Sequence, residues 1–325
     1  MRLSASEKQE IINLVERSEL GVNRTLREFG IHKSTFYKWY QAYVKKGPDG
    51  LLPQRRTRQQ WNSIPPAQKE LVAEIALEHP ALSPRELSVK ITDEQQIFIS
   101  ESSVYRILKS RGLITTPAHI LLSASNEFKN KTNFVHELWQ TDFTYFKILG
   151  WGWYYLSTIL DDYSRFIIQW ELCKTMSVAD VERSIERALA VAGLQNGQRP
   201  KLLSDNGSCY IASELKEYLQ SKGVVPIHGR VNHPQTQGKI ERYHRSMKNI
   251  VKLDNYYCPE ELEEALDKFV YYYNHQRYHE SLNNVTPADV YYGKKETILR
   301  RRERIKNQNM KQRRSLYYIR KLNPI

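Results

Sequence analysis

Three acidic residues stand in sequence surroundings that set them apart from ordinary surface charges. Asp142 lies inside the aromatic run WQTDFTY, and Asp205 follows the apolar start of LLSDNGS. Glu241 comes after a gap of 35 residues, at the start of an amphipathic helix rich in cations. Carboxylates are preferred ligands of Mg²⁺ and Mn²⁺, and two such ions about 3.5–4 Å apart can activate a hydroxyl for in-line attack on a phosphate. If the fold brings Asp142, Asp205 and Glu241 together, they could hold two Mg²⁺ or Mn²⁺ ions for chemistry on a nucleic-acid phosphate.

Spacing alone does not establish such a site. Asp and Glu make up 36 of the 325 residues, so chance supplies three acids at almost any chosen spacing. Asp205 precedes an Asn-Gly pair and could simply shape a turn, whereas Asp142 would be costly to bury without a partner. Asp161 and Asp162 fit a hairpin turn better than a metal site. The prediction for the three acids depends on the fold bringing them together.

Strand and helix patterns follow one another through the central part of the chain. Three strand-like runs separated by turn residues predict an antiparallel meander over Leu138–Ile148, Tyr154–Leu160 and Arg165–Leu172. Helices are then predicted over Ser177–Ala192, Ala212–Lys222, Gln237–Lys252 and Glu260–Tyr273, and strands over Lys201–Ser204 and Val224–Ile227. This order predicts an α/β fold, with a mixed sheet flanked by helices, over residues 136–293.

The helix that carries Glu241 has two predicted faces. Its apolar residues recur at spacings of three and four, which predicts a packed face made of Ile240, Tyr243 and Met247. Glu241 and Lys248 lie nearly two turns apart and therefore point the same way. The preceding loop, His233–Gly238, is predicted to face DNA. The predicted DNA contacts of this region are His233, Gln235, Lys239, Arg242, Arg245 and Lys248. Arg277 and His279, further along, could either brace the core or touch DNA.

Two short all-helical segments precede the core. Residues 1–50 are predicted to form a helix-turn-helix module, with Ser6 capping the first helix and a recognition helix at about 33–44. A linker at 51–64 leads to a second such module at 65–115, and residues 116–135 link it to the core. An ordinary three-helix bundle is the alternative for the first module. The residues predicted to contact DNA are Lys33, Ser34, Thr35 and Lys38 in the first module and Ser103 and Arg106 in the second.

The net charge of +13 is unevenly spread along the chain. Residues 1–135 carry 20 basic against 14 acidic side chains, residues 136–293 carry 17 against 20, and residues 294–325 carry 12 against 2. A near-neutral centre between basic flanks predicts a catalytic core with polyanion-binding arms, the basic C-terminal tail at 294–325 among them. A merely solubilising surface is the alternative. The sequence contains no run of 18 apolar residues, so we expect no transmembrane helix. Its three scattered cysteines suit a reducing cytoplasm.

Several of these motifs, in order, resemble those of one family. WQTDFTY, LDDYSRF, SDNGS and NHPQTQGKIER resemble the successive motifs of DDE transposases of insertion sequences, which are related to retroviral integrases. The spacing from Asp205 to Glu241, with Lys248 seven residues later, resembles their D,D(35)E pattern. Downstream, YNHQRYHESLNNVTPADVYYG resembles the family's Tyr-Asn to Thr-Pro ending. The resemblance covers residues 136–293, and it departs from retroviral integrases in lacking a His-His-Cys-Cys module ahead of the core.

The resemblance implies a fold, a reaction and a set of partners. It implies a ribonuclease H-like core, a pair of Mg²⁺ ions held by the three acids, and cleavage of DNA followed by strand transfer. The implied partners are double-stranded DNA, both the inverted-repeat ends of a mobile element and its target, and further copies of the chain. The implied location is the nucleoid of a bacterial cytoplasm. The alternatives are a non-catalytic DNA-binding regulator and a nuclease acting on RNA–DNA hybrids.

Overall fold

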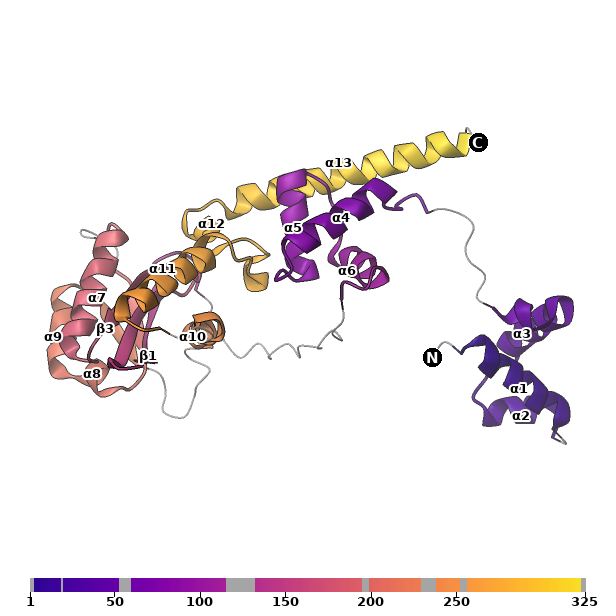
Figure 1. Cartoon of the computed structure of the whole chain (residues 1–325), viewed down its shortest axis with the longest axis horizontal. Coiled ribbons are helices and arrows are strands. Elements are labelled where there is room, and N and C mark those ends of the chain that lie inside the picture. The colour runs from indigo at the N-terminus through magenta and orange to yellow at the C-terminus, as the bar shows by residue number, and fades with distance from the viewer. Residues whose placement is uncertain are drawn as a thin grey trace. The chain divides into compact units, whose positions relative to one another are not determined.

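The described chain divides into two compact units. The computed structural model describes residues 3–18, 20–52, 60–114, 132–194, 199–228, 238–251 and 256–322, except for the side chains of residues 320 and 322. One unit comprises residues 1–63 and 316–325, and the other comprises residues 64–315. Figure 1 shows the helices of the first unit and the sheet and helices of the second. No helix among the described residues is long and apolar enough to cross a membrane.

The N-terminal unit contains a small helical core. Its elements are α1 (Ala5–Arg17), α2 (Val22–Glu28), α3 (Lys33–Lys46) and the 3₁₀ helix η1 (Gly47–Leu51). Ile12, Leu26 and Phe36 are buried where the three helices meet. The predicted cap at Ser6 is wrong. Ser4 caps α1 instead, because its hydroxyl and the Glu7 carboxylate form a reciprocal capping box.

A second helical module opens the larger unit. It consists of α4 (Pro66–Glu78), α5 (Pro84–Gln95) and α6 (Glu101–Ser110). Ser83 caps α5 through a capping box with Glu86, and Pro84 occupies the first turn, where a missing N–H costs nothing. The buried residues of this module include Val72, Leu87, Ile91, Ile99 and Val104.

The part of the larger unit that follows the second module is built on one five-stranded sheet. Its strands are β1 (Leu138–Ile148), β2 (Gly152–Asp161), β3 (Ile167–Cys173), β4 (Lys201–Ser204) and β5 (Val225–His228). Their order across the sheet is β3-β2-β1-β4-β5. The first three strands pair antiparallel, whereas β4 lies parallel to both β1 and β5. The predicted mixed sheet, with its antiparallel meander at 138–172, is confirmed.

Helices cover both faces of this sheet, and strand alternation decides which side chains meet them. One face packs against α7 (Val178–Val191), α8 (Ser208–Ile211) and α9 (Ser213–Ser221) through a cluster that includes Trp139 and Ile159. The other face packs against α10 (Gly238–Val251) and α11 (Pro259–His275) through a cluster that includes Phe146 and Leu156. Even-numbered positions of β1 therefore face α10.

The basic C-terminal segment is a long helix rather than an irregular tail. After η3 (Glu280–Leu282) and α12 (Pro287–Tyr291), α13 runs over Lys295–Leu322. Within the larger unit this helix packs on the second helical module. Arg313 Nη2 donates to the Phe98 carbonyl oxygen at 2.7 Å, and Asn309 Oδ1 accepts from the Phe98 backbone N–H at 3.3 Å. Part of the positive charge of this segment is therefore used in contacts within the protein.

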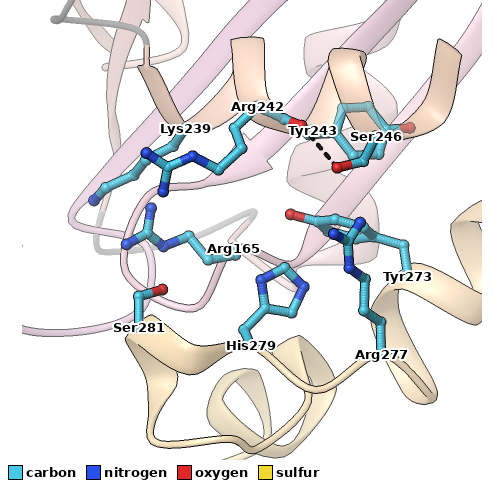
Figure 2. A pocket seen from close by; sticks show the side chains of 9 residues that line it. All are labelled: Arg165, Lys239, Arg242, Tyr243, Ser246, Tyr273, Arg277, His279 and Ser281. Atoms are coloured by element: carbon cyan, nitrogen blue, oxygen red, sulfur yellow. Dashed lines mark hydrogen bonds between the residues drawn. The ribbon is translucent and has the colours of Figure 1, made fainter. Parts of the chain in front are cut away.

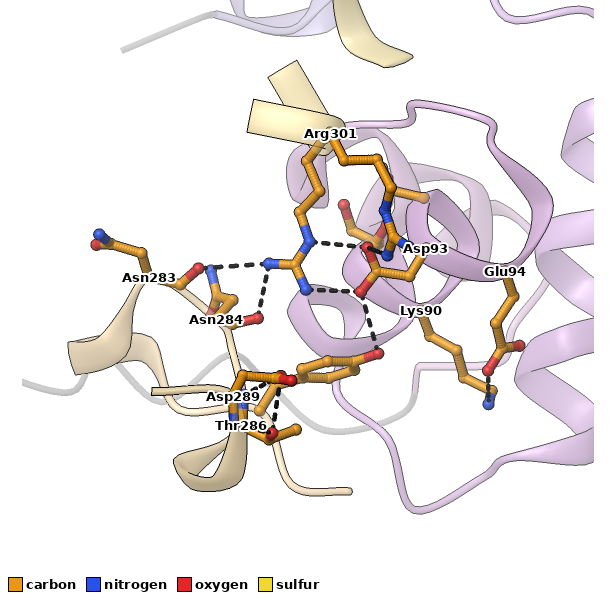
Figure 3. A network of polar contacts seen from close by, with 12 residues as sticks. Lys90, Asp93, Glu94, Asn283, Asn284, Thr286, Asp289 and Arg301 are labelled. Atoms are coloured by element: carbon orange, nitrogen blue, oxygen red, sulfur yellow. Dashed lines mark hydrogen bonds and ion pairs between the residues drawn. The ribbon is translucent and has the colours of Figure 1, made fainter. Parts of the chain in front are cut away.

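Asp93 is the centre of the polar contact between α5 and α13. Arg302 donates to it twice, from Nε at 2.8 Å and from Nη2 at 2.6 Å. Figure 3 shows Asp93 within the surrounding polar contacts. The two side chains are only 14% and 13% exposed. Tyr278 Oη donates to Asp93 at 3.4 Å, and Arg302 Nη1 donates to the Asn284 carbonyl oxygen at 2.8 Å. One carboxylate thus joins the second module, α13 and the segment that follows α11.

Replacing Asp93 with alanine should loosen the larger unit. The Asp93→Ala variant leaves the Arg302 guanidinium mostly buried without its carboxylate, so we expect the free energy of unfolding to fall by about 3 kcal/mol. Urea unfolding and hydrogen exchange in α4, α5 and α6 measure the loss.

The neighbouring Glu94 provides the matched control. It pairs with Lys90 one turn back on α5 and is 49% exposed. Glu94→Ala should change the free energy of unfolding by less than about 1 kcal/mol. Equal losses in the two variants would contradict the role assigned to Asp93.

Candidate active site

The sheet brings Asp142 and Asp205 to neighbouring strands. The parallel register of β1 and β4 pairs Leu138 with Lys201 and Gln140 with Leu203. Continued by two residues, this register sets Asp142 beside Asp205, the first residue after β4. Neighbouring strands lie about 4.8 Å apart, so the two carboxylates share one edge of the site.

The pKa values of two side chains in α8 also indicate that Asp142 and Asp205 lie close together. Burial raises the pKa of the Cys209 thiol, and the negative charges of Asp205 and Asp142 raise it further. Burial also raises the pKa of Tyr210 well above its usual value, and the same two carboxylates add to this effect. Both acids therefore act on a single region beside the end of β4 and the middle of β1.

Asp205 is held by the turn that follows it. Its Oδ1 accepts a hydrogen bond from the Gly207 backbone N–H at 3.0 Å. A Cβ on Gly207 would lie only 3.0 Å from the same oxygen, so a larger residue would crowd the carboxylate. The Asp205 side chain is nevertheless exposed. The turn-shaping interpretation is therefore correct, and it leaves the carboxylate open to a ligand.

Helix α10 packs next to Asp142, as its sequence pattern predicts. Ile240, Tyr243 and Met247 are at most 1% exposed and form its packed face. On the flank of this face, His244 Nδ1 lies 3.3 Å from Asp142 Oδ2. Glu241 is exposed one turn before His244, and residues three apart on a helix share a side. His244 therefore links the helix that carries the third acid to the strand that carries the first.

Gln140 fixes where α10 begins. Its Oε1 accepts from the Ile240 backbone N–H at 3.1 Å, and its Nε2 donates to Asp162 Oδ1 at 2.7 Å. Lys239 forms an ion pair with Asp162 and also donates to its carbonyl oxygen at 2.9 Å. Burial lowers the pKa of Lys239. Asp162 thus ties the hairpin between β2 and β3 to the first turn of α10.

Asp161 has a separate, structural role in the same hairpin. It is fully buried and accepts hydrogen bonds from the backbone N–H groups of His136 and Ser164, each at 2.8 Å. The Ser164 hydroxyl donates to it at 2.6 Å. Both aspartates of the pair therefore shape the hairpin and its surroundings, in line with the sequence-based interpretation.

Asp142 and Asp205 are neighbours and Glu241 lies on the helix that packs beside Asp142, but the three acids do not form a closed set of metal ligands. Among the described residues, no group of three or more His, Cys, Asp or Glu side chains is close enough together to hold a metal ion. The donor chemistry still suits a hard cation, because Asp142 and Asp205 offer carboxylate oxygens at neighbouring positions. Asp142 is 22% exposed, so its carboxylate is reached from outside. Metal binding by these residues stays a prediction.

The predicted DNA contacts are distributed over both units. Lys33, Ser34, Thr35 and Lys38 are all exposed on α3, and Arg242 and Arg245 are exposed on α10. On α6, Arg106 Nη2 donates to Ser103 Oγ at 3.2 Å. Lys248 Nζ lies 5.1 Å from the centre of the Tyr145 ring. His233 and Gln235 lie outside the described residues, and all these contacts remain predictions.

His244 and Gln140 were not among the predicted site residues. His244 could have been recognised, because it lies three residues after Glu241, on the side of the helix that carries Glu241 and Lys248. Gln140 carries no comparable local signal, since its partners lie 22 and 100 residues away.

Four segments of the chain match known protein families. Residues 133–234 and 222–287 each match the integrase core domain. Residues 7–58 match a helix-turn-helix domain, and residues 35–108 match a homeodomain-like domain. The integrase matches extend from just before β1 to the start of α12, and the other two cover the helical modules. The predicted helix-turn-helix segments and ribonuclease H-like core are thereby confirmed.

Individual relatives agree with these matches. An uncharacterized transposase-like protein of Haemophilus influenzae is 29% identical over 146 residues, which cover 43% of this chain and 64% of that protein. The putative transposase for insertion sequence element IS986/IS6110 of Mycobacterium tuberculosis is 26% identical over 147 residues, covering 43% of this chain and 52% of that protein. The chain thus spans less than two thirds of the length of either curated relative.

Among solved structures, the HTLV-2 integrase catalytic core domain in complex with magnesium is 20% identical, with a TM-score of 0.39. The match covers 49% of this chain and 97% of that one. Taken together, these matches make the chain similar to integrase core domains and to transposases of insertion sequences, with helix-turn-helix segments ahead of the core.

Proposed function

We propose that the chain is a transposase that binds the terminal inverted repeats of a mobile element and catalyses metal-dependent DNA cleavage and strand transfer. One observation carries the proposal. The parallel register of β1 and β4 sets Asp142 beside Asp205, and α10, which carries Glu241, packs against Asp142 through His244. This arrangement supports a site in which the two aspartates and Glu241 act together.

The reaction consists of two displacements at phosphorus. Water first attacks a phosphodiester at the element end, which breaks a P–O bond and leaves a free 3′ hydroxyl and a 5′ phosphate. The 3′ hydroxyl then attacks a phosphodiester of the target, so one P–O bond forms as another breaks. A pair of Mg²⁺ ions bound by the acids would activate the attacking oxygen and stabilise the leaving one.

The residues around the acids position them for this chemistry. His244 orients the Asp142 carboxylate, and the Gly207 N–H fixes one oxygen of Asp205. Gln140 and Asp162 set the first turn of α10 and with it the position of Glu241. No covalent bond between protein and DNA is required, because the attacking groups are water and a DNA hydroxyl.

DNA recognition is assigned to the helical modules. The exposed residues at the N-terminal end of α3 lie where a recognition helix contacts base edges and phosphates in the major groove. The second module would extend the site that is read. Because two element ends must be joined to one target, the active form is proposed to be an oligomer of this chain.

Replacing each acid by its amide should abolish joining while leaving DNA binding intact. We expect Asp142→Asn, Asp205→Asn and Glu241→Gln each to lower strand transfer at least about a hundredfold, because each removes a charged ligand. The assay is joining of end-containing oligonucleotides to target DNA in Mg²⁺, and chelation by EDTA should stop it. DNA binding is measured in parallel.

Asp267→Asn is the matched control, since Asp267 is exposed on α11. Its joining rate should equal that of the parent chain. Normal joining by the three amide variants would show that the acids are not catalytic and would favour a regulator that binds DNA without cutting it.

The first module should contribute phosphate contacts that depend on salt. The double substitution Lys33→Gln/Lys38→Gln removes two cations from the exposed side of α3. We expect weaker binding to element ends, with the slope of log K against log salt reduced by about two. Fluorescence anisotropy over a salt series measures the slope, and Lys45→Gln at the far end of α3 is the control. An unchanged slope would assign DNA binding to another surface.

A further inference from the structure

A basic pocket lies on the opposite side of α10 from the acids. It is lined by α10, by the end of α11 and the segment after it, and by the loop between β2 and β3, as Figure 2 shows. Its nine lining residues are Arg165, Lys239, Arg242, Tyr243, Ser246, Tyr273, Arg277, His279 and Ser281. Four of them are cations and none is acidic.

The positive charge of this pocket is only partly compensated. Lys239 has Asp162 as its ion-pair partner, but no ion pair within 4.0 Å involves Arg165, Arg242 or Arg277 in the part of the chain that the structure describes. Burial lowers the pKa of Arg165 and so does the charge of Arg242, whereas Asp162, Tyr273 and Asp161 raise it without cancelling the effect of burial. The guanidinium groups therefore repel one another in a setting where water screens them poorly.

His279 and Arg165 each have a buried polar atom that makes no hydrogen bond to the described residues. These atoms are His279 Nε2 and Arg165 Nε. Burial, followed by the charges of Arg277, Arg165, Arg85 and Arg242, lowers the pKa of His279 to about 3. A buried guanidinium N–H is a donor that an anion would satisfy, and the Nε2–H tautomer or the protonated form of the imidazole would donate to it as well.

Helix α10 places this pocket at a fixed separation from the acids. Lys239, Arg242 and Ser246 lie at spacings of three and four on one flank, and Glu241, His244 and Lys248 lie at the same spacings on the other. A helix with its side chains is about 10–12 Å across. A strand that crosses α10 would therefore present different phosphates to the pocket and to the acids.

We propose that the pocket binds a backbone phosphate of the DNA strand, on the far side of α10 from the phosphate that reacts at the acids. The position of the reacting phosphate rests on the proposed function, whereas the anion binding rests on the pocket itself. Arg242 and Arg277 bind the phosphate oxygens from two sides, and Arg165 and His279 contribute donors from the base of the pocket. The strand crosses α10 between the two flanks.

Neutral variants of the two outer arginines test the proposal. We expect Arg242→Gln and Arg277→Gln each to weaken binding of duplex DNA about tenfold and to reduce the salt slope by about one. Lys268→Gln is the control, because Lys268 is 74% exposed on α11 and lies away from the pocket lining. If both pocket variants keep the affinity and salt slope of the parent, the proposal is overturned.

Binding of a small anion tests the pocket independently of the DNA reaction. Pyrophosphate should raise the pKa of His279 by about 1–3 in the parent chain, because an anion now faces the imidazole alongside Arg277, Arg165, Arg85, Arg242 and the Tyr273 ring. NMR of histidine-labelled protein measures this change, and Arg242→Gln should diminish it. An unchanged His279 titration at saturating pyrophosphate counts against the pocket.

The two proposals fail in different ways. A parent chain that binds DNA and pyrophosphate as described but joins no DNA refutes the proposed function and leaves the pocket standing. A parent chain that joins DNA, with pocket variants that bind it normally, refutes the pocket and leaves the proposed function standing.

Discussion

The parallel pairing of β1 with β4 is the constraint on which the site depends. Asp142 lies within one strand and Asp205 directly after the other, so their distance is set by backbone hydrogen bonds rather than by their side chains. A slip of one residue would turn Asp142 to the opposite face of the sheet, away from α10 and His244. The antiparallel pairing of β1 with β2 from Trp139 to Ile148 holds that register over ten pairs. The acids can therefore remain partly open to ligand without losing their alignment.

Local patterns in the sequence predicted those features that local physics determines. The three meander strands were predicted from apolar runs between turns, and the packed face of α10 from spacings of three and four. The contacts between distant segments could not be predicted in this way. His244 meets Asp142 across 102 positions and Arg302 meets Asp93 across 209, and no periodicity in a single sequence encodes such pairs. The cap of α1 was misplaced by two residues because Ser4 and Ser6 are both good caps, and only Ser4 has Glu7 three residues later.

The net charge of each segment, counted from the sequence, does not show which basic side chains are paired within the protein and which are exposed. The segment from 294 to 325 is strongly basic, yet Arg302 and Arg313 point into the protein and bind Asp93, Phe98 and Gln68. The central region is slightly acidic overall, yet its basic side chains gather around α10 and the segment after α11. A polyanion interacts with the charges of the surface that it contacts, not with the net charge of the whole domain. The near-neutral core can therefore present a stronger positive potential around α10 than its net charge indicates.

The contact between Asp93 and Arg302 has a consequence for how such chains diversify. Residues 64–114 and α13 stand at opposite ends of the larger unit in sequence, but they share a buried charge pair. A recombinant that inherits one segment from each of two diverged parents can receive a carboxylate without its guanidinium, or the reverse. The pair is kept where both segments are inherited together, or where the break falls before residue 64.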